Sequence, residues 1–139
     1  MTSIAIVDSG PLIATINAAD PFHSACRALL EDARFHLVIP ALCVAEAAFV
    51  LQRRRGSETE AAFVRGLSDL DVRSPAADDW PSIAELVERY AGLRLGTTDA
   101  TVIVLAEKLR TDVVFTLDRR HFEVVKPRHC ERLRLYRDK

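Results

Sequence analysis

Two kinds of hydrophobic pattern alternate along the chain: short unbroken apolar runs, and longer stretches in which apolar residues recur every three or four positions. An unbroken run is typical of a strand buried on both faces, and the longer spacing is typical of a helix with one apolar face. The runs predict strands at residues 3–7, 35–39, 70–72, 113–116 and 133–136, the last at an edge of the sheet. The spaced pattern predicts helices from Pro11, over about 20–33, from Leu42 to Arg53, over 57–67, over 76–90 and from Asp99 to about 109. Strands and helices in this alternation predict a three-layer α/β fold with a central, mainly parallel sheet flanked by helices.

Local signals place the starts of several predicted helices. Asp20 is expected to cap a helix whose first residue is Pro21, because aspartate accepts hydrogen bonds from the first turn and proline lacks the N–H left free there. Ser57 is expected to open a further helix through a capping box with Glu60.

Length and composition are those of an ordinary globular protein. With 139 residues, of which 49% are hydrophobic and 28% charged, the chain is predicted to form one domain over residues 1–139. The net charge of −1 gives no strong overall attraction to nucleic acid, so any RNA contact must come from local basic patches.

Cys26, Cys43 and Cys130 have no CxxC spacing and are interpreted as reduced thiols. The start lacks basic residues, and no apolar run reaches the roughly 18 residues of a membrane span, so a cytoplasmic protein without a membrane anchor is predicted.

Four acidic residues occupy positions that suit a metal site. Asp8 directly follows the first predicted strand and Asp118 closely follows the strand at 113–116, at the edge where parallel sheets bind ligands. Glu46 and Asp99 lie on predicted helices beside apolar residues, where an unpaired carboxylate is costly. Convergence of the four would favour a divalent cation, and oxygen ligands alone favour Mg²⁺ or Mn²⁺ over zinc. Such an ion can activate water for in-line attack on a phosphate.

Each acid also has a purely structural interpretation, which the sequence leaves open. Asp8 can cap the turn that follows it, and Asp99 can sit in the first turn of its helix because the helix dipole favours a negative charge there. Glu46 and Asp118 can form ion pairs with cationic neighbours, which are Arg53 or Arg54 for the first and Arg119 or Arg120 for the second. The joint pattern is more informative than any single acid.

Four stretches, taken in order, resemble the PIN-domain family and, within it, the VapC toxins of toxin–antitoxin pairs. They are residues 6–12 (IVDSGPL), 44–46 (VAE), 98–100 (TDA) and 114–122 (VFTLDRRHF), and they extend from near the start of the chain to Phe122. The last stretch is the most specific, since it resembles the family's T-x-D-x-x-F ending with an additional arginine and histidine. One departure is the Gly10-Pro11 pair, which stands where many relatives have a small or hydroxyl residue and an aliphatic one.

The resemblance implies a twisted parallel sheet between helices, with the acids gathered in one groove. By position, Asp8, Glu46 and Asp99 match the metal-holding core and Asp118 the fourth acid, and these four are the expected catalytic residues. The hydroxyl positions that border the site correspond to Ser9 and Thr116. The resemblance further implies a Mg²⁺- or Mn²⁺-dependent endoribonuclease that forms a homodimer and is inhibited by a VapB-like antitoxin.

Basic and aromatic residues give weaker signals about the substrate. Arg119 and Arg120 lie beside Asp118 and are expected to contact RNA phosphates, because arginine matches phosphate geometry with paired hydrogen bonds. The run of arginines at residues 53–55 is interpreted as a solvated helix end. His121 is interpreted as a packing or capping residue and is left out of the catalytic set, since metal-activated water needs no histidine base. The larger aromatic residues are expected to serve packing or a subunit contact.

Three other functions are alternatives to a nuclease. A receiver-like signalling domain would have paired acids after its first strand and a lysine after a late strand, and the chain has neither pattern. A phosphatase with an aspartate nucleophile would have a second acid two residues later, where Gly10 stands. The remaining alternative is a non-catalytic PIN-type module that binds RNA or a protein partner.

Overall fold

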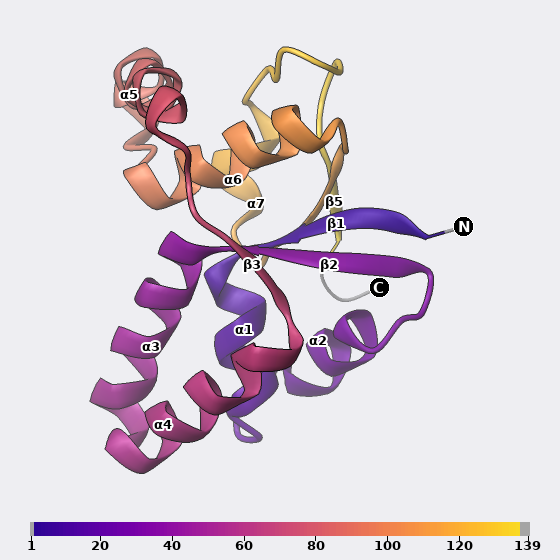
Figure 1. Cartoon of the computed structure of the whole chain (residues 1–139), viewed down its shortest axis with the longest axis vertical. Helices are drawn as coiled ribbons and strands as arrows, with labels where there is room; N and C mark the ends of the chain where they lie inside the picture. The colour runs from indigo at the N-terminus through magenta and orange to yellow at the C-terminus, as the bar shows by residue number, and fades with distance from the viewer. Residues whose placement is uncertain (1, 137–139) are drawn as a thin grey trace.

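A parallel sheet forms the centre of the molecule in the computed structural model, which describes residues 2–136 (Figure 1). Its five strands are β1 (Ser3–Val7), β2 (Phe35–Pro40), β3 (Asp71–Arg73), β4 (Val113–Phe115) and β5 (Arg134–Tyr136). They lie in the order β3-β2-β1-β4-β5, and every neighbouring pair is parallel. The predicted α/β fold with a mainly parallel sheet is therefore confirmed, as is the edge position of the last strand.

Helices cover both faces of this sheet. They are α1 (Ser9–Ile16), α2 (His23–Leu30), α3 (Ala41–Arg55), α4 (Ser57–Gly66), α5 (Trp80–Arg89), α6 (Thr97–Leu109) and α7 (Arg119–Glu123), with 3₁₀ turns η1 (Leu67–Asp69), η2 (Ala77–Asp79) and η3 (Ala91–Leu93). Figure 1 shows α1 to α4 on one side of the sheet and α5 and α6 on the other, which gives the three predicted layers. Among the described residues, no helix is both long and apolar enough to cross a membrane.

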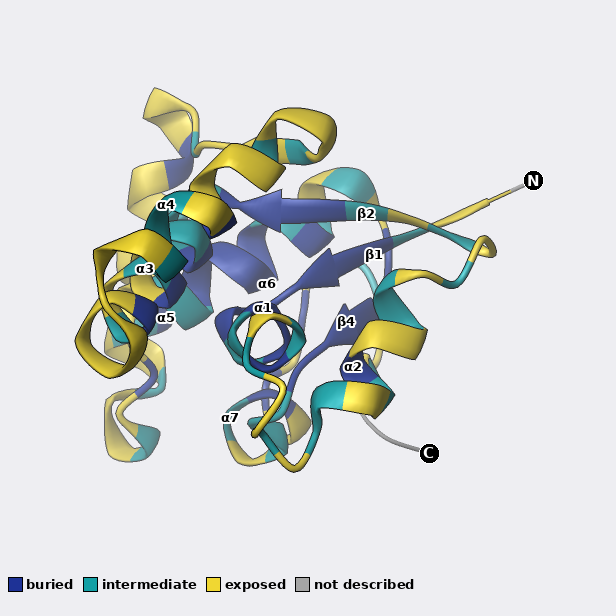
Figure 2. Cartoon of the chain, turned by 90° about the horizontal axis from the view of Figure 1, so that it is seen from below, coloured by how far each residue is buried: buried dark blue, intermediate teal, exposed yellow. Residues whose placement is uncertain are grey.

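The core lies where β1 and β4 pack between the two helical layers. Ile6, Val7 and Phe115 are fully buried in the strands, and Val102 and Ile103 are fully buried on α6. Figure 2 accordingly shows β1, β4 and much of α6 in the colour of buried residues, while α4 is mostly exposed. Burial from both faces is the physical reason why these strands are continuous apolar runs in the sequence.

Several boundaries differ from the sequence predictions. The second helix begins at His23 rather than Pro21, because Asp20 Oδ1 accepts the Phe22 amide at 2.8 Å and holds a turn before the helix starts. At the start of α4, Gly56 is the capping residue, and no side-chain cap from Ser57 forms. Helix α6 starts two residues before Asp99, and the short helix α7, directly after Asp118, was not predicted.

Candidate active site

Two of the predicted acids lie at the carboxyl edge of neighbouring strands. Val7 pairs with Phe115 in the parallel register of β1 and β4, so the residues that follow these strands emerge side by side. The backbone amide of Asp8 donates to the Phe115 carbonyl at 2.9 Å, and Asp118 follows two residues after Thr116. The sheet therefore brings together residues that are 110 positions apart in the sequence.

The glycine at position 10 allows the start of α1 to lie close to the segment that follows β4. A Cβ atom on Gly10 would lie 3.3 Å from Cβ of Leu117, in the segment between β4 and Asp118. That separation is tighter than ordinary van der Waals contact, so a larger residue at position 10 would require the Leu117 side chain to shift by a few tenths of an ångström. The departure from the family pattern at this position thus has a packing explanation.

The Asp8 carboxylate is buried and fully oriented by donors. Only 5% of the residue is exposed. Its Oδ1 accepts the Ser9 amide at 2.8 Å, which caps α1, and lies 3.7 Å from the Cys43 thiol; its Oδ2 accepts the Thr116 hydroxyl at 2.8 Å. The pKa of Asp8 is raised to about 6. Burial is the main cause, the two hydrogen bonds oppose it, and the nearby carboxylates of Asp99 and Glu46 add to it. Asp8 is therefore both a helix cap and one member of an acidic cluster.

Glu46 reaches the cluster from α3 through a hydroxyl group. The Ser9 hydroxyl donates to Glu46 Oε1 in a short contact, so Ser9 links the end of β1 to α3. The expectation that apolar surroundings isolate this carboxylate was wrong, because Glu46 and the neighbouring Phe49 are exposed, Phe49 by 60%. Arg53 is not its partner either: the guanidinium of Arg53 lies over the Phe49 ring, 5.6 Å from the centroid.

Asp99 lies in the first turn of α6. Its Oδ2 lies 3.4 Å from the Gly96 amide, in the position of a capping box. Burial raises the pKa of Asp99; the Gly96 amide and His121 lower it, while the charges of Asp118 and Glu46 raise it. The four predicted acids are gathered in one region: Ser9 bonds to Asp8 and to Glu46, Thr116 bonds to Asp8 and to the Asp118 amide, and His121 lies close to Asp99 and Asp118.

The fourth acid, Asp118, is accompanied by His121, a residue not predicted to belong to the site. The Asp118 amide donates to the Thr116 hydroxyl oxygen at 2.9 Å, so Thr116 connects Asp8 with Asp118. His121 Nδ1 lies 2.7 Å from Asp118 Oδ2 and 3.4 Å from Asp99 Oδ2. The i, i+3 spacing of Asp118 and His121 was the available signal, but it has meaning only on a helix, and α7 was not predicted.

The two arginines expected to contact RNA differ in their surroundings. Arg119 Nε forms an ion pair with Glu123 at 2.9 Å, and its Nη1 donates to the Leu135 carbonyl at 3.3 Å, so this side chain ties α7 to β5. Arg120 is exposed on the same helix. Of the two, Arg120 is the more available for a ligand.

The donor set suits a hard divalent cation. The buried Asp8 carboxylate forms no ion pair within residues 2–136, and its closest charged neighbours are other carboxylates. Oxygen donors from β1, α3, α6 and the end of β4 are the ligand type that Mg²⁺ and Mn²⁺ prefer. Across the described part of the chain, however, no group of three His, Cys, Asp or Glu side chains is already arranged so that it could hold an ion. The residues fit such an ion chemically, but their present spacing is not that of a finished coordination shell.

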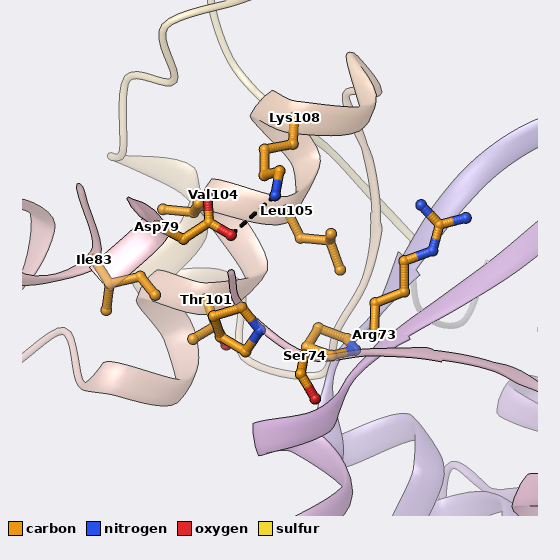
Figure 3. Close-up of a pocket in the computed structure, with 10 residues that line it drawn as sticks. Arg73, Ser74, Asp79, Ile83, Thr101, Val104, Leu105 and Lys108 are labelled. Atoms are coloured by element: carbon orange, nitrogen blue, oxygen red, sulfur yellow. Dashed lines mark hydrogen bonds and ion pairs between the residues drawn. The ribbon is translucent and has the colours of Figure 1, made fainter. Parts of the chain in front are cut away.

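A separate pocket lies away from the acids, between α5, α6 and the segment after β3 (Figure 3). Its cavity volume is about 20 Å³, close to that of a single water molecule and far below that of a nucleotide. Figure 3 shows Lys108 directed at Asp79 across this pocket, and their ion pair measures 3.0 Å. The pocket is therefore too small to bind substrate, and the residues around it pack α5 against α6.

Comparison with known proteins agrees with this architecture. The PIN domain family model matches residues 5–127. Ribonuclease VapC26 of Mycobacterium tuberculosis is 33% identical over 124 residues, which are 88% of this chain and 92% of that protein. Two solved structures share the fold. Mycobacterium tuberculosis VapC20, a sarcin–ricin loop cleaving toxin, has a TM-score of 0.72 and 22% identity, and the match covers 82% of this chain and 91% of that one. VapBC2 from Rickettsia felis, bound to a DNA fragment from its promoter, has a TM-score of 0.67 and 17% identity, and the match covers 96% of this chain and 98% of that one. The family match and the identity to VapC26 together show that this chain belongs to the PIN-domain family and to its VapC group.

Proposed function

We propose that this protein is an endoribonuclease toxin of the VapC type, and that Asp8, Glu46, Asp99 and Asp118 hold a Mg²⁺ or Mn²⁺ ion for hydrolysis of RNA phosphodiester bonds. The relation to VapC26, a ribonuclease that the chain matches over most of its length, supports the activity. The fold shared with VapC20, which cleaves the sarcin–ricin loop, supports RNA as the substrate class.

The observation that carries the metal-dependent mechanism is the environment of Asp8. A carboxylate that is 5% exposed, with other carboxylates as its charged neighbours, is expensive to ionise without a cation. A bound ligand can offset the unfavourable free energy of such an arrangement, and carboxylates with perturbed pKa values cluster at functional sites. A divalent cation is the ligand that removes the repulsion among all four acids at once.

The hydroxyl residues keep the acidic side chains in place. Thr116 donates to Asp8 and accepts from the Asp118 amide, so it fixes the orientation of one carboxylate and the backbone position of the other. Ser9 orients Glu46 in the same way. When bound, a divalent ion supplies activation of water and charge neutralisation at the scissile phosphate. On α7, the exposed Arg120 is placed to pair with a neighbouring phosphate of the RNA strand.

The membership in the VapC group extends the proposal to partners and compartment. A VapB-like antitoxin is proposed as the inhibitor, supported by the fold shared with VapBC2. A homodimer is proposed as the active form, because the chain's net charge of −1 leaves RNA contacts to local basic patches that a second subunit can complete. The cytoplasm is proposed as the compartment, in agreement with cysteines that form no disulfide among the described residues.

The test is cleavage of total cellular RNA by purified, antitoxin-free protein with Mg²⁺, with Mn²⁺ or with EDTA. Asp99→Asn is the test variant, and Asp78→Asn is the matched control because Asp78 is exposed on η2. Discrete fragments from the wild type and the control, absent with EDTA and with Asp99→Asn, are expected. Fragments that persist unchanged in Asp8→Asn and Asp99→Asn would remove the site assignment. Intact RNA, together with no divalent binding in calorimetry, would leave the non-catalytic PIN-type module as the function.

A further inference from the structure

An exposed row of side chains on α3, the α3 stripe, begins at the acidic site. It consists of Glu46, Phe49 and Arg53, whose spacings of three and four residues place them along one face of the helix. All three residues are exposed, and Figure 2 shows that the outward side of α3 faces solvent. The hydroxyl of Ser9, which directly follows Asp8, donates to Glu46. One end of the α3 stripe therefore belongs to the acidic cluster.

The ring of Phe49 contributes little to packing within the subunit. It is 60% exposed, the highest value among the exposed large hydrophobic residues in the described part of the chain. A single exposed apolar residue needs no explanation by itself. Phe49, however, follows Glu46 by three residues, which is about 4.5 Å along the helix axis. A nucleotide whose phosphate reaches the acids can therefore lay a base on this ring, and aromatic side chains bind bases by stacking.

Arginines continue the α3 stripe beyond Phe49. The guanidinium of Arg53 lies over the Phe49 ring, 5.6 Å from its centroid, in the run of exposed arginines at residues 53–55 that ends α3. Within residues 2–136 none of these arginines forms an ion pair with a carboxylate, and Arg55 donates only to the amide oxygen of Asn17, at 3.4 Å. Several arginines elsewhere on the surface are ion-paired. The charge at the end of α3 is therefore available to phosphates, which arginine binds with paired hydrogen bonds.

We propose that the α3 stripe binds the RNA strand beside the bond that is cut, with one base stacked on Phe49 and the arginines at 53–55 paired with neighbouring phosphates. The inference rests on the proposed function, since it takes RNA as the substrate and the acids as the site of cleavage. Unpaired positive charge next to an exposed ring favours a nucleic acid over an apolar protein segment, which would need only the ring. Stacking recognises the face of any base, so this contact holds the strand without selecting its sequence.

The test uses a single-stranded RNA probe, an oligouridine of about eight nucleotides that contains 5-iodouridine. Binding is measured in the Asp99→Asn chain, so that the bound RNA stays intact. Irradiation joins 5-iodouridine to an aromatic side chain stacked on it, and mass spectrometry identifies that residue. Fluorescence anisotropy at several salt concentrations gives the affinity and its dependence on salt.

Two variants separate stacking from charge, and each has a matched control. Phe49→Ala removes the ring, and Trp80→Ala is its control, because Trp80 is also an exposed aromatic residue (45%) but lies on α5, across the sheet (Figure 1). Arg53→Gln removes one charge, and Arg110→Gln is its control, because Arg110 is exposed after the end of α6 and forms no ion pair among the described residues.

Cross-linking is expected at Phe49 and not at Trp80. Phe49→Ala should bind the probe about fivefold more weakly or worse, with an unchanged salt dependence, because stacking on a neutral ring releases no counterions. Arg53→Gln should reduce the slope of log affinity against log salt concentration by about 0.7, the value for one phosphate contact on a single strand. Both controls should bind as the parent chain does.

An affinity that Phe49→Ala leaves unchanged, with cross-linking at other residues, would overturn the inference whatever the effect of Arg53→Gln, and would leave the exposed ring to a protein partner. Metal-dependent cleavage by the wild type would in that case still support the proposed function. A protein that neither binds the probe nor cleaves cellular RNA would overturn both. If Phe49→Ala does not fold, the cross-linked residue in the parent chain decides.

Discussion

Replacing Asp8 with asparagine is expected to stabilise the metal-free protein while removing most of its stabilisation by metal. The pKa of Asp8 rises from its ordinary value of 3.8 to about 6, chiefly because of burial, so the folded protein binds this proton more tightly than the unfolded chain does. The stabilisation from protonated Asp8 is complete below pH 3.8 and is lost as the pH rises through about 6. The shift corresponds to about 3 kcal/mol of unfolding free energy lost at pH 7.5.

The asparagine of the Asp8→Asn variant carries no charge at any of these pH values, so the variant does not suffer this loss. We expect it to be more stable than the metal-free wild type by about 2 kcal/mol at pH 7.5. The gain is smaller than the full amount because an amide has one acceptor oxygen, whereas the Asp8 carboxylate accepts from both Ser9 and Thr116. Urea unfolding in EDTA at pH 4 and at pH 7.5 measures the difference, with Asp78→Asn as the control for loss of one exposed charge.

Mg²⁺ should reverse the order of stability. An ion that binds only the folded state raises the unfolding free energy of the wild type in proportion to the logarithm of its concentration, and the Asp8→Asn variant should lose most of that increase. The reasoning would be refuted by a variant that is no more stable than the wild type at pH 7.5 in EDTA. A stability difference as large at pH 4 as at pH 7.5 would refute it equally, because Asp8 of the wild type is largely protonated at pH 4.

Three further predictions concern side chains around the site and behind it. Thr116→Val should lower the unfolding free energy by about 1–3 kcal/mol in urea, because Asp8 loses a buried donor and the Asp118 amide an acceptor; an unchanged midpoint would contradict the network. Cys43 should resist iodoacetamide at pH 8 in the folded protein, because burial and the nearby Asp8 charge raise the pKa of its thiol far above the usual range; rapid labelling seen by mass spectrometry would show that the site opens. Asp79→Ala should cost about 1–2 kcal/mol of stability in urea, because it removes the 3.0 Å contact with Lys108 and the acceptor for the Ala76 amide, and it should leave the metal response unchanged.

The sequence determined the sheet and placed Asp8 and Asp118 at its carboxyl edge, because the relevant signals are local. Strand β1 matched its predicted range, since burial on both faces requires an unbroken apolar run. Asp8 directly follows one buried strand and Asp118 closely follows another. Parallel pairing of the two strands brings both positions to the same edge of the sheet, independently of the connecting loops. The structural interpretation of Asp8 as a cap was also correct, because one carboxylate serves both purposes.

Tertiary structure decided what each side chain faces. Hydrophobic spacing predicted the existence of α3 but misjudged its exposed side, because Phe49 lies in solvent and Glu46 finds its partner in Ser9 rather than in an arginine. The five-residue helix α7 is too short for periodicity to reveal, so no pattern in the sequence placed His121 beside Asp118. A hydrophobic pattern along the chain predicts which face of a helix or strand is apolar. The partner of a polar side chain depends instead on which element packs against it in the tertiary structure.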